Sequence, residues 1–290
     1  IKIPSTISYI GKNAFNDCCL LTKIEIPTSV SSIGEGSFKK CISLKEINIP
    51  PIVTKIENDT FFDCSSLTHC NIPSSIKSIE LYAFYGCTSL KEIIIPPSVT
   101  IIGREAFKKC SSLTQLIIPS SVTKIGWGAF SDCSSLIKIS IESLITSFVG
   151  YTFCKCTKLS DFSFSVSLTD FGQGDFIGCS SLIKIDIPSS IKSIPDDCFR
   201  DCSSLVEIII PSSVTLIGKS AFKGCSSIIQ LTIPPSVVSI GDEAFNGCPK
   251  LANLIILSNS IQSIGKCLFK GCSSLNDFII PSSIVLINDD

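Results

Sequence analysis

Cysteine is the residue type in this sequence with the widest capacity for chemistry, because a thiol can act as a nucleophile, a metal ligand or a disulfide partner. The chain contains 17 cysteines, and most of them recur three residues after a phenylalanine. This constant spacing indicates a structural role, in which reduced thiols pack into a tight turn as small hydrophobic side chains with a weak donor. The members of this cysteine ladder are Cys18, Cys41, Cys64, Cys87, Cys110, Cys133, Cys156, Cys179, Cys202, Cys225, Cys248 and Cys272.

Disulfide bonds between successive members of the cysteine ladder are the alternative to reduced thiols. Stacked repeats bring such sulfur atoms close, but a disulfide also needs a specific dihedral angle that a simple translation does not provide. The total of 17 is odd, so complete pairing within the chain is impossible. The remaining cysteines, Cys19, Cys70, Cys154, Cys198 and Cys267, lack the paired CxxC elements and histidines of a zinc site, so we expect no metal and no cofactor. Cys267 is the best candidate for a reactive thiol, because its turn is expected to face solvent.

The single histidine, His69, is the other residue that could take part in acid-base chemistry. Glu46 and Glu92 occupy the same position in the repeats before and after it. With one histidine and no accompanying nucleophile motif, a serine or cysteine triad is not available. The two glutamates are expected on a broad sheet face that does not exclude water, which argues against catalysis. We therefore expect His69 to be a solvated surface residue and the protein not to be an enzyme.

These residues are positioned by an internal repeat of 23 residues, marked by phenylalanine from Phe15 to Phe245. In one unit, the spacing of Leu113, Leu116 and Ile118 ends in the period-two alternation of a short strand. Pro119 cannot donate a backbone hydrogen bond, so it ends this strand. The segment 122–125 predicts a second extended piece, and 126–133 predicts a tight helical or 3₁₀ turn.

A single repeat cannot bury enough apolar surface to fold alone, so the repeats must stack on one another. The predicted fold class is α/β. It is a right-handed leucine-rich-repeat solenoid with a parallel sheet on its concave face, short second strands, and helical or 3₁₀ turns on its convex side. We expect one domain of about twelve repeats over residues 1–290, taken as a fragment of a longer array because it opens and ends within a repeat.

The repeating unit Cys-Ser-Ser-Leu-x-x-Ile-x-Ile-Pro-Ser-Ser-Val-x-x-Ile-Gly-x-x-Ala-Phe resembles the Treponema pallidum-type, or BspA-like, class of leucine-rich repeats. The resemblance covers the whole chain. It implies a surface protein of a host-associated bacterium or a parasitic protist. It also implies that the array adheres to host cells, to extracellular-matrix proteins or to other microbes.

The repeats between Ile141 and Phe176 depart from this unit. Glu142 and Ser165 replace the proline, and Val149 replaces the glycine. Aromatic rings stand where other repeats carry isoleucine, and we expect them to fill the same inward positions. A locally widened core is one interpretation and a specialised recognition segment is the other. The aromatic residues are Phe148, Phe162, Phe164 and Phe171.

Two columns of side chains should project outward from the first strands and form the candidate binding face. The first column is Lys23, Glu46, His69, Glu92, Gln115, Lys138, Asp161, Lys184, Glu207, Gln230, Asn253 and Asp277. The second is Glu25, Asn48, Asn71, Ile94, Ile117, Ser140, Ser163, Asp186, Ile209, Thr232, Ile255 and Ile279. Exposed apolar neighbours favour a partner, although isoleucine also suits a strand for its own sake. The candidate partner-binding residues are Glu46, His69, Glu92, Gln115, Ile94, Ile117, Ile209, Ile255 and Ile279. Aromatic residues on the convex side, Tyr82, Trp127 and Tyr151, are further candidate anchors.

Composition narrows the classes of partner. Lysine and arginine number 24 against 25 acidic residues, and no basic run is interleaved with aromatic residues, so nucleic acid is not expected. No apolar stretch is long enough for a membrane helix. The predicted function is surface adhesion to a protein or glycan, with an extracellular or cell-surface location. The alternative is an intracellular scaffold, which the unpaired thiols favour.

Overall fold

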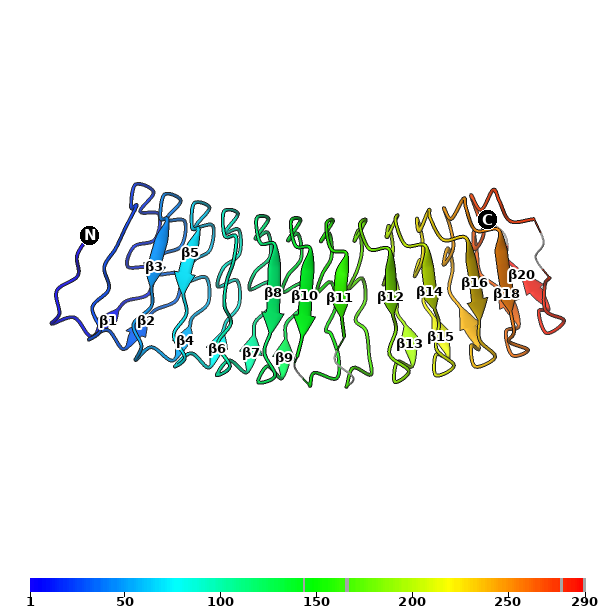
Figure 1. Cartoon of the computed structure of the whole chain (residues 1–290), viewed down its shortest axis with the longest axis horizontal. Coiled ribbons are helices and arrows are strands. Elements are labelled where there is room, and N and C mark those ends of the chain that lie inside the picture. The colour runs from blue at the N-terminus through cyan, green and yellow to red at the C-terminus, as the bar shows by residue number, and fades with distance from the viewer. Residues whose placement is uncertain (143, 165–166, 277–278, 289–290) are drawn as a thin grey trace. The chain divides into compact units, whose positions relative to one another are not determined.

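The computed structural model describes residues 1–142, 144–164, 167–276 and 279–288. Ser165 and Asp277, two of the positions considered above, lie outside these residues. The chain divides into two compact units, Ile1–Ile145 and Thr146–Asp290. Each unit is a stack of similar coils joined by parallel strand pairs (Figure 1). That the two units form one continuous array stays a prediction.

In the first unit, each coil contributes up to two short strands. The longer ones, which we call first strands, are β3 (Glu46–Asn48), β5 (His69–Asn71), β8 (Gln115–Ile118) and β10 (Lys138–Ile141). The second strands are β1 (Tyr9–Ile10), β2 (Ser32–Ile33), β4 (Lys55–Ile56), β6 (Ser78–Ile79), β7 (Ile101–Ile102) and β9 (Lys124–Ile125). All pairing is parallel: β1 with β2, β3 with β5, β8 with β10, and β4, β6, β7 and β9 in a row.

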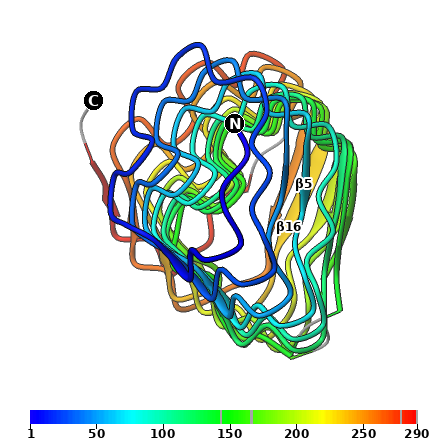
Figure 2. The same cartoon turned by 90° about the vertical axis from the view of Figure 1, so that its left-hand side faces the viewer.

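The second unit repeats this arrangement. Its first strands are β11 (Asp161–Ser163), β12 (Lys184–Asp186), β14 (Glu207–Ile209), β16 (Gln230–Ile233) and β18 (Asn253–Ile256). Its second strands are β13 (Ser193–Ile194), β15 (Leu216–Ile217), β17 (Ser239–Ile240), β19 (Ser263–Ile264) and β20 (Leu286–Ile287). The parallel partners are β12 with β14, β16 with β18, and β19 with β20, while β13, β15 and β17 form a row in that order. Figure 2 views the coils end-on, with β5 and β16 marking the first-strand side of their own units.

Alternation along the first strands places side chains as the sequence predicts. In β8, Leu116 and Ile118 are buried, whereas Gln115 and Ile117 are exposed. The repeated phenylalanines fill the coil interior and stack face to face between neighbouring coils. Ring centroids lie 5.2 Å apart for Phe84 and Phe107 in the first unit. This distance matches the spacing of adjacent strands plus a small offset between rings.

The predicted helical turns, and with them the α/β class, are wrong: the described residues contain strands and turns but no helix. The reason lies in how the turn uses its N–H groups. In the turn that contains Phe107, the N–H groups of Glu105, Phe107 and Lys109 donate to carbonyl groups of the next coil. Glu105 and Lys109 also adopt left-handed φ values of 50° and 62°. A helix needs every N–H to bond within its own turn at a right-handed φ, so this segment cannot be one.

Glycine permits a close approach of consecutive coils at Gly126, although Glu57, Glu80 and Pro195 occupy the same position in other repeats. A Cβ atom on Gly126 would lie 2.4 Å from the backbone nitrogen of Arg104 in the preceding coil. The equivalent position in the second unit is Val149, and here the turn is altered. The neighbouring Gly150 takes a φ of 126°, and Val149 is exposed. Glu80 also replaces the glycine, yet its N–H keeps the regular bond to the carbonyl of Ile56, so the altered path at Val149 does not follow from the loss of glycine alone.

The departing repeats contain a packed aromatic cluster. Phe148 and Phe171 are buried, while Phe162 and Phe164 are half-buried. Phe162 lies 5.1 Å from Phe153 and 4.6 Å from Phe164, measured between ring centroids. These rings pack against the phenylalanine stack of the second unit, as the interpretation of a widened core predicts.

A buried carboxylate adjoins this cluster and was not anticipated from the sequence. Asp175 is completely buried at a position where half of the repeats carry alanine. Its Oδ1 accepts a hydrogen bond from the N–H of Thr152 at 3.1 Å, and its Oδ2 accepts one from the N–H of Gly172 at 2.6 Å. In regular coils the glycine N–H instead donates to a carbonyl of the preceding coil, as Gly218 does to Ile194 at 2.7 Å. Asp175 thus supplies acceptors that the altered backbone no longer provides.

Candidate binding face

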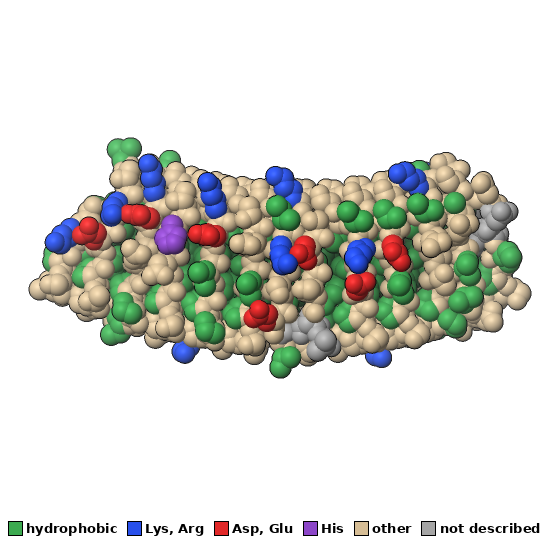
Figure 3. Space-filling view, viewed as in Figure 1, with side chains coloured by type: hydrophobic (Ala, Val, Ile, Leu, Met, Phe, Trp, Pro, Cys, Tyr) green, Lys and Arg blue, Asp and Glu red, His purple; other side chains and the backbone are tan. Residues whose placement is uncertain are grey.

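The first strands of each unit present two outward columns, which together we call the first-strand face. Glu46, His69, Glu92 and Gln115 are all exposed on it. The isoleucines of the second column are also largely open to solvent. Their exposed fractions are 82% for Ile94, 59% for Ile117, 69% for Ile209, 53% for Ile255 and 85% for Ile279. The predicted facing is confirmed, and a role in binding stays a prediction. In each unit, hydrophobic side chains lie beside charged ones (Figure 3).

On the first-strand face of the first unit, two oppositely charged side chains form an ion pair with each other. The Nζ of Lys23 lies 2.8 Å from Oε1 of Glu46. The hydrogen bond from Lys23 and its positive charge lower the pKa of Glu46, and the same contact raises the pKa of Lys23. His69 is the parallel register partner of Glu46 on β5. Because both ion-paired groups are exposed, the pair contributes little to stability and marks a solvated stripe.

A hollow of about 370 Å³ lies farther along the same face of the first unit. It is formed between β8 and the coil segment 92–95, and this segment belongs to no assigned strand although every one of its residues is described. The rows on either side are regular, since β3 pairs with β5 and β8 pairs with β10. The lining residues are Glu92, Ile93, Ile94, Ile95, Gln115, Leu116 and Ile117.

The second unit has a comparable hollow of about 320 Å³. It lies over β14, β16 and β18, and β14 and β16 are adjacent without being hydrogen-bonded as a sheet. Both hollows therefore occur where the parallel row of first strands is interrupted. The residues that line the second hollow are Glu207, Ile208, Ile209, Ile210, Gln230, Leu231, Thr232, Pro234, Asn253, Ile255 and Leu257.

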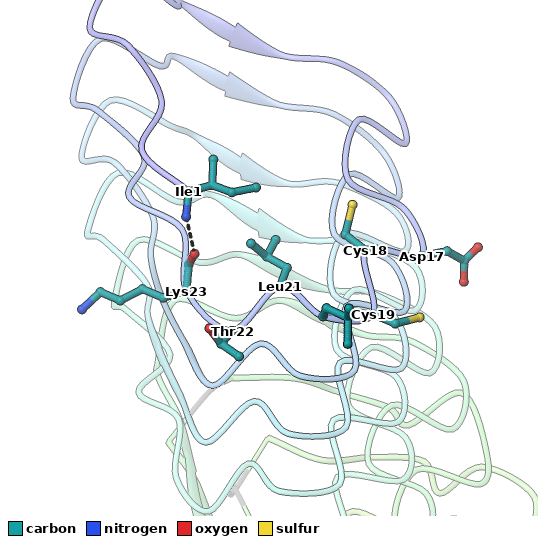
Figure 4. Close-up of a pocket in the computed structure, with 8 residues that line it drawn as sticks. Ile1, Asp17, Cys18, Cys19, Leu21, Thr22 and Lys23 are labelled. Carbon is teal, nitrogen blue, oxygen red and sulfur yellow. Dashed lines mark hydrogen bonds between the residues drawn. The ribbon is translucent and has the colours of Figure 1, made fainter.

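A third hollow, of about 600 Å³, is formed by the first coil of the first unit and is shown in Figure 4. The terminal ammonium of Ile1 donates to the carbonyl oxygen of Lys23 at 2.9 Å. Leu20 at its margin is 92% exposed. Asp17 and Lys23 point away from the coil on opposite sides (Figure 4). Lys23 is the one residue of the two columns that lines this hollow, so the hollow is a weaker candidate for a binding site.

Cysteines of the ladder donate the same hydrogen bond to the preceding coil, and this bond explains their constant spacing. The Sγ of Cys64 donates to the carbonyl oxygen of Phe38 at 3.0 Å, and the Sγ of Cys225 donates to that of Phe199 at 3.1 Å. Burial raises the pKa of Cys41 and of Cys133 to about 12. Since the thiolate is the reactive form, such groups are poor nucleophiles. The same bond is made by Cys41, Cys87, Cys110, Cys133, Cys179, Cys202, Cys248 and Cys272.

The cysteines outside the ladder lie in different environments. Cys70, Cys154 and Cys198 are buried, whereas Cys19 is exposed. Cys267 is predicted to face solvent but is half-buried, and it lies in a turn with a left-handed φ of 50°. The described residues contain no group of three or more His, Cys, Asp or Glu side chains suited to a metal ion.

The aromatic residues on the turn side are engaged by their own chain. The guanidinium of Arg104 lies 4.9 Å from the centre of the Trp127 ring, and the Nζ of Lys108 lies 5.7 Å from it. Tyr82 packs edge-on against Tyr85, with 5.7 Å between centroids. Tyr82, Trp127 and Tyr151 are half-buried. These contacts favour a structural role for the rings.

Within the part of the chain that the structure describes, no helix has the length and apolar character needed to cross a membrane.

The sequence matches the family model described as BspA type Leucine rich repeat region (6 copies) over residues 1–91, 77–206 and 192–290. A leucine-rich repeat protein from Bacteroides ovatus is 31% identical, with 85% of this chain and 81% of that chain covered and a TM-score of 0.45. A leucine rich cell surface protein from Faecalibacterium prausnitzii is 28% identical, with 88% and 87% covered and a TM-score of 0.54.

The pneumococcal vaccine antigen PcpA is 22% identical, with 99% of this chain and 73% of that chain covered, and it shares the fold at a TM-score of 0.60. No curated protein matches the sequence significantly. The family model accounts for the chain from its first residue to its last, and the stacked coils have the repeat length that the sequence predicts. The chain belongs to the BspA-type leucine-rich repeat family.

Proposed function

We propose that this chain is a non-catalytic binding array that adheres, at a cell surface, to a protein or glycan of a host or of its extracellular matrix. The observation that carries the proposal is the first-strand face, where exposed isoleucines stand beside polar side chains around the two hollows. Contiguous exposed apolar side chains with a polar rim are typical of interaction sites. Ile117, Ile209 and Ile255 stand on strands, which hold such side chains more rigidly than loops do.

The location is supported by similarity. The Faecalibacterium prausnitzii relative is described as a cell surface protein and resembles this chain over 88% of its length. A non-catalytic role is supported by the chemistry of the candidate residues. Burial raises the pKa of the ladder thiols, such as Cys133 to about 12. His69 is an exposed side chain on an open strand face, where a reaction would not be shielded from water.

The test is adhesion of the whole chain to immobilised extracellular-matrix proteins and cell-surface glycans. A face variant carries Ile94→Ser, Ile117→Ser, Ile209→Ser and Ile255→Ser. The matched control carries Ile101→Ser and Leu216→Ser, which remove exposed apolar side chains from second strands. We expect the face variant to lose about tenfold or more in affinity, about 1.4 kcal/mol, and the control to bind as the parent does. Equal behaviour of the two variants toward every ligand that binds would contradict the proposal.

An intracellular scaffold is the alternative function. The cysteine ladder favours it, because buried thiols that donate hydrogen bonds suit a reducing compartment. Labelling of intact producing cells with a membrane-impermeant amine reagent distinguishes the two functions. Modification of exposed lysines such as Lys124 supports the surface array, whereas modification only after lysis supports the scaffold. Alkylation of the denatured, unreduced protein adds to this test. If nearly all 17 thiols are free, the intracellular scaffold remains possible. If most of them are paired in disulfides, the protein lies outside the cell.

A further inference from the structure

Two hollows of the first-strand face, beside Glu92 and beside Glu207, share three lining residue types at equivalent positions five repeats apart, although Thr232 stands in the second where Ile117 stands in the first. Glu92 in the first unit corresponds to Glu207 in the second, and Gln115 corresponds to Gln230. In the second column, Ile94 corresponds to Ile209. Each hollow therefore combines one carboxylate, one amide on the next coil and exposed isoleucine. This combination of side chains recurs in both units, whatever the shape of each hollow.

The carboxylate of the first hollow is open to a cation from outside the chain. Lys23 neutralises Glu46 on the same column at 2.8 Å. No described cationic group forms such an ion pair with Glu92, although the residues around it are all described. The neighbours of Glu92 along the column are His69 and Gln115. Lys138 is the register partner of Gln115 on the far side, but among the residues that line the hollow Glu92 alone carries a charge.

The second hollow has the same carboxylate beside a competing lysine. Lys184 of β12 is the parallel register partner of Glu207 on β14. Among the ion pairs of the described residues, however, none joins these two side chains. Lys184 therefore reduces the negative charge near the second hollow without occupying the carboxylate.

We propose that each hollow receives a basic side chain, lysine or arginine, from the partner protein; this inference rests on the proposed binding function. The aliphatic stem packs against Ile94 and Ile117 in the first unit, and against Ile209 and Ile255 in the second. Long basic side chains bury their stems along apolar surfaces while their charged heads stay in water. The head group pairs with the carboxylate of Glu92 or Glu207 and donates to the amide oxygen of Gln115 or Gln230. An acidic side chain is disfavoured by the same carboxylates.

The test uses isoleucine-methyl NMR of the whole chain, titrated with three short peptides in which glycine alternates with lysine, Nε-acetyl-lysine or glutamate. Acetylation keeps the stem and removes the charge, so it isolates the carboxylate contribution. We expect the lysine peptide to shift the methyl signals of Ile94, Ile117, Ile209 and Ile255. The acetylated peptide should bind more weakly, and the glutamate peptide should leave these signals unchanged. Added salt should weaken the lysine peptide most.

Variants assign the effect to each carboxylate. Glu92→Gln and Glu207→Gln should each lower the affinity of the local hollow for the lysine peptide by about two- to fivefold, as expected for an exposed ion pair. Glu142→Gln, an exposed acid that lines neither hollow, is the matched control and should change nothing. Lys184→Ala should strengthen binding at Ile209 and Ile255 alone.

Equal binding of the lysine and acetyl-lysine peptides would overturn the basic partner while leaving the proposed function intact. Shifts confined to other isoleucines would likewise overturn it. If the proposed function is wrong, the serine face variant adheres as well as the parent, whatever the peptides do. The two failures are therefore distinguishable.

Discussion

The thiol of Cys110 donates a hydrogen bond to the backbone carbonyl oxygen of Phe84, with 3.2 Å between sulfur and oxygen. Both residues are completely buried, and Cys110 belongs to the coil that follows Phe84. The cysteine thus fills the turn and gives the carbonyl group a second donor beside the N–H of Cys87. This relationship recurs along both units and gives the cysteine spacing a physical cause.

Cys110→Ala should destabilise the first unit. The variant removes one of the two hydrogen bonds to a buried carbonyl and leaves a small cavity, which together cost about 1–3 kcal/mol. Urea denaturation followed by circular dichroism measures the loss. Cys19→Ala is the control, because Cys19 is exposed and should change stability by less than about 0.5 kcal/mol. Similar losses for both variants would show that the buried thiol has no special role.

Asp175 should make the stability of the second unit depend on pH. Burial raises the pKa of Asp175 from 3.8 to about 7, against the lowering effect of the N–H groups of Thr152 and Gly172. Between these values the folded state holds a proton that the unfolded state has released, so stability falls as pH rises from about 4 to about 7. The slope is at most about 1.4 kcal/mol per pH unit.

Asp175→Asn provides the comparison, because it keeps an acceptor and cannot ionise. Between pH 5 and pH 8, the parent should lose about 3 kcal/mol relative to this variant. Chemical denaturation at several pH values, read from hydrogen exchange of the second unit, measures the difference. Parallel pH profiles for parent and variant would show that the carboxyl group does not titrate in this range.

Ile94→Lys combined with Ile117→Lys should leave thermal stability nearly unchanged. Both side chains are more than half exposed, so the substitutions remove little buried surface and should cost less than about 0.5 kcal/mol each. Leu116→Lys in the same strand is the contrasting variant, since Leu116 is buried and a lysine there should unfold the coil. A large loss for the double variant would mean that the isoleucines belong to the core.

Deletion of the whole repeat from Phe107 to Ala129 should give a folded protein. Phe130 then takes the place of Phe107, and every coil keeps a neighbour in the same register, as expected of a stack stabilised by nearest-neighbour contacts. Circular dichroism and size-exclusion chromatography provide the readout. Deletion of residues 107–118 alone is the control and should disrupt the first unit, because it breaks the register. Insolubility of the full-repeat deletion would contradict nearest-neighbour stacking.

The amino-acid sequence by itself determined the repeat and the direction of its side chains. A strict 23-residue period can be satisfied only by equivalent coils, and alternation within Leu116, Ile117 and Ile118 assigns each side chain to the core or to the surface. These are local properties, so the sequence predicts the exposed isoleucines correctly. The family resemblance follows from the same pattern.

Only the tertiary structure decided where hydrogen bonds run between coils. The turn at Glu105 and Lys109 has the length of a helical turn, but its alternate N–H groups bond to the next coil, which no local pattern reveals. The interrupted rows beside Glu92 and Glu207, and the buried carboxylate of Asp175, have the same origin. Each depends on partners one repeat away in sequence and adjacent in space, so it exists only once the coils have stacked.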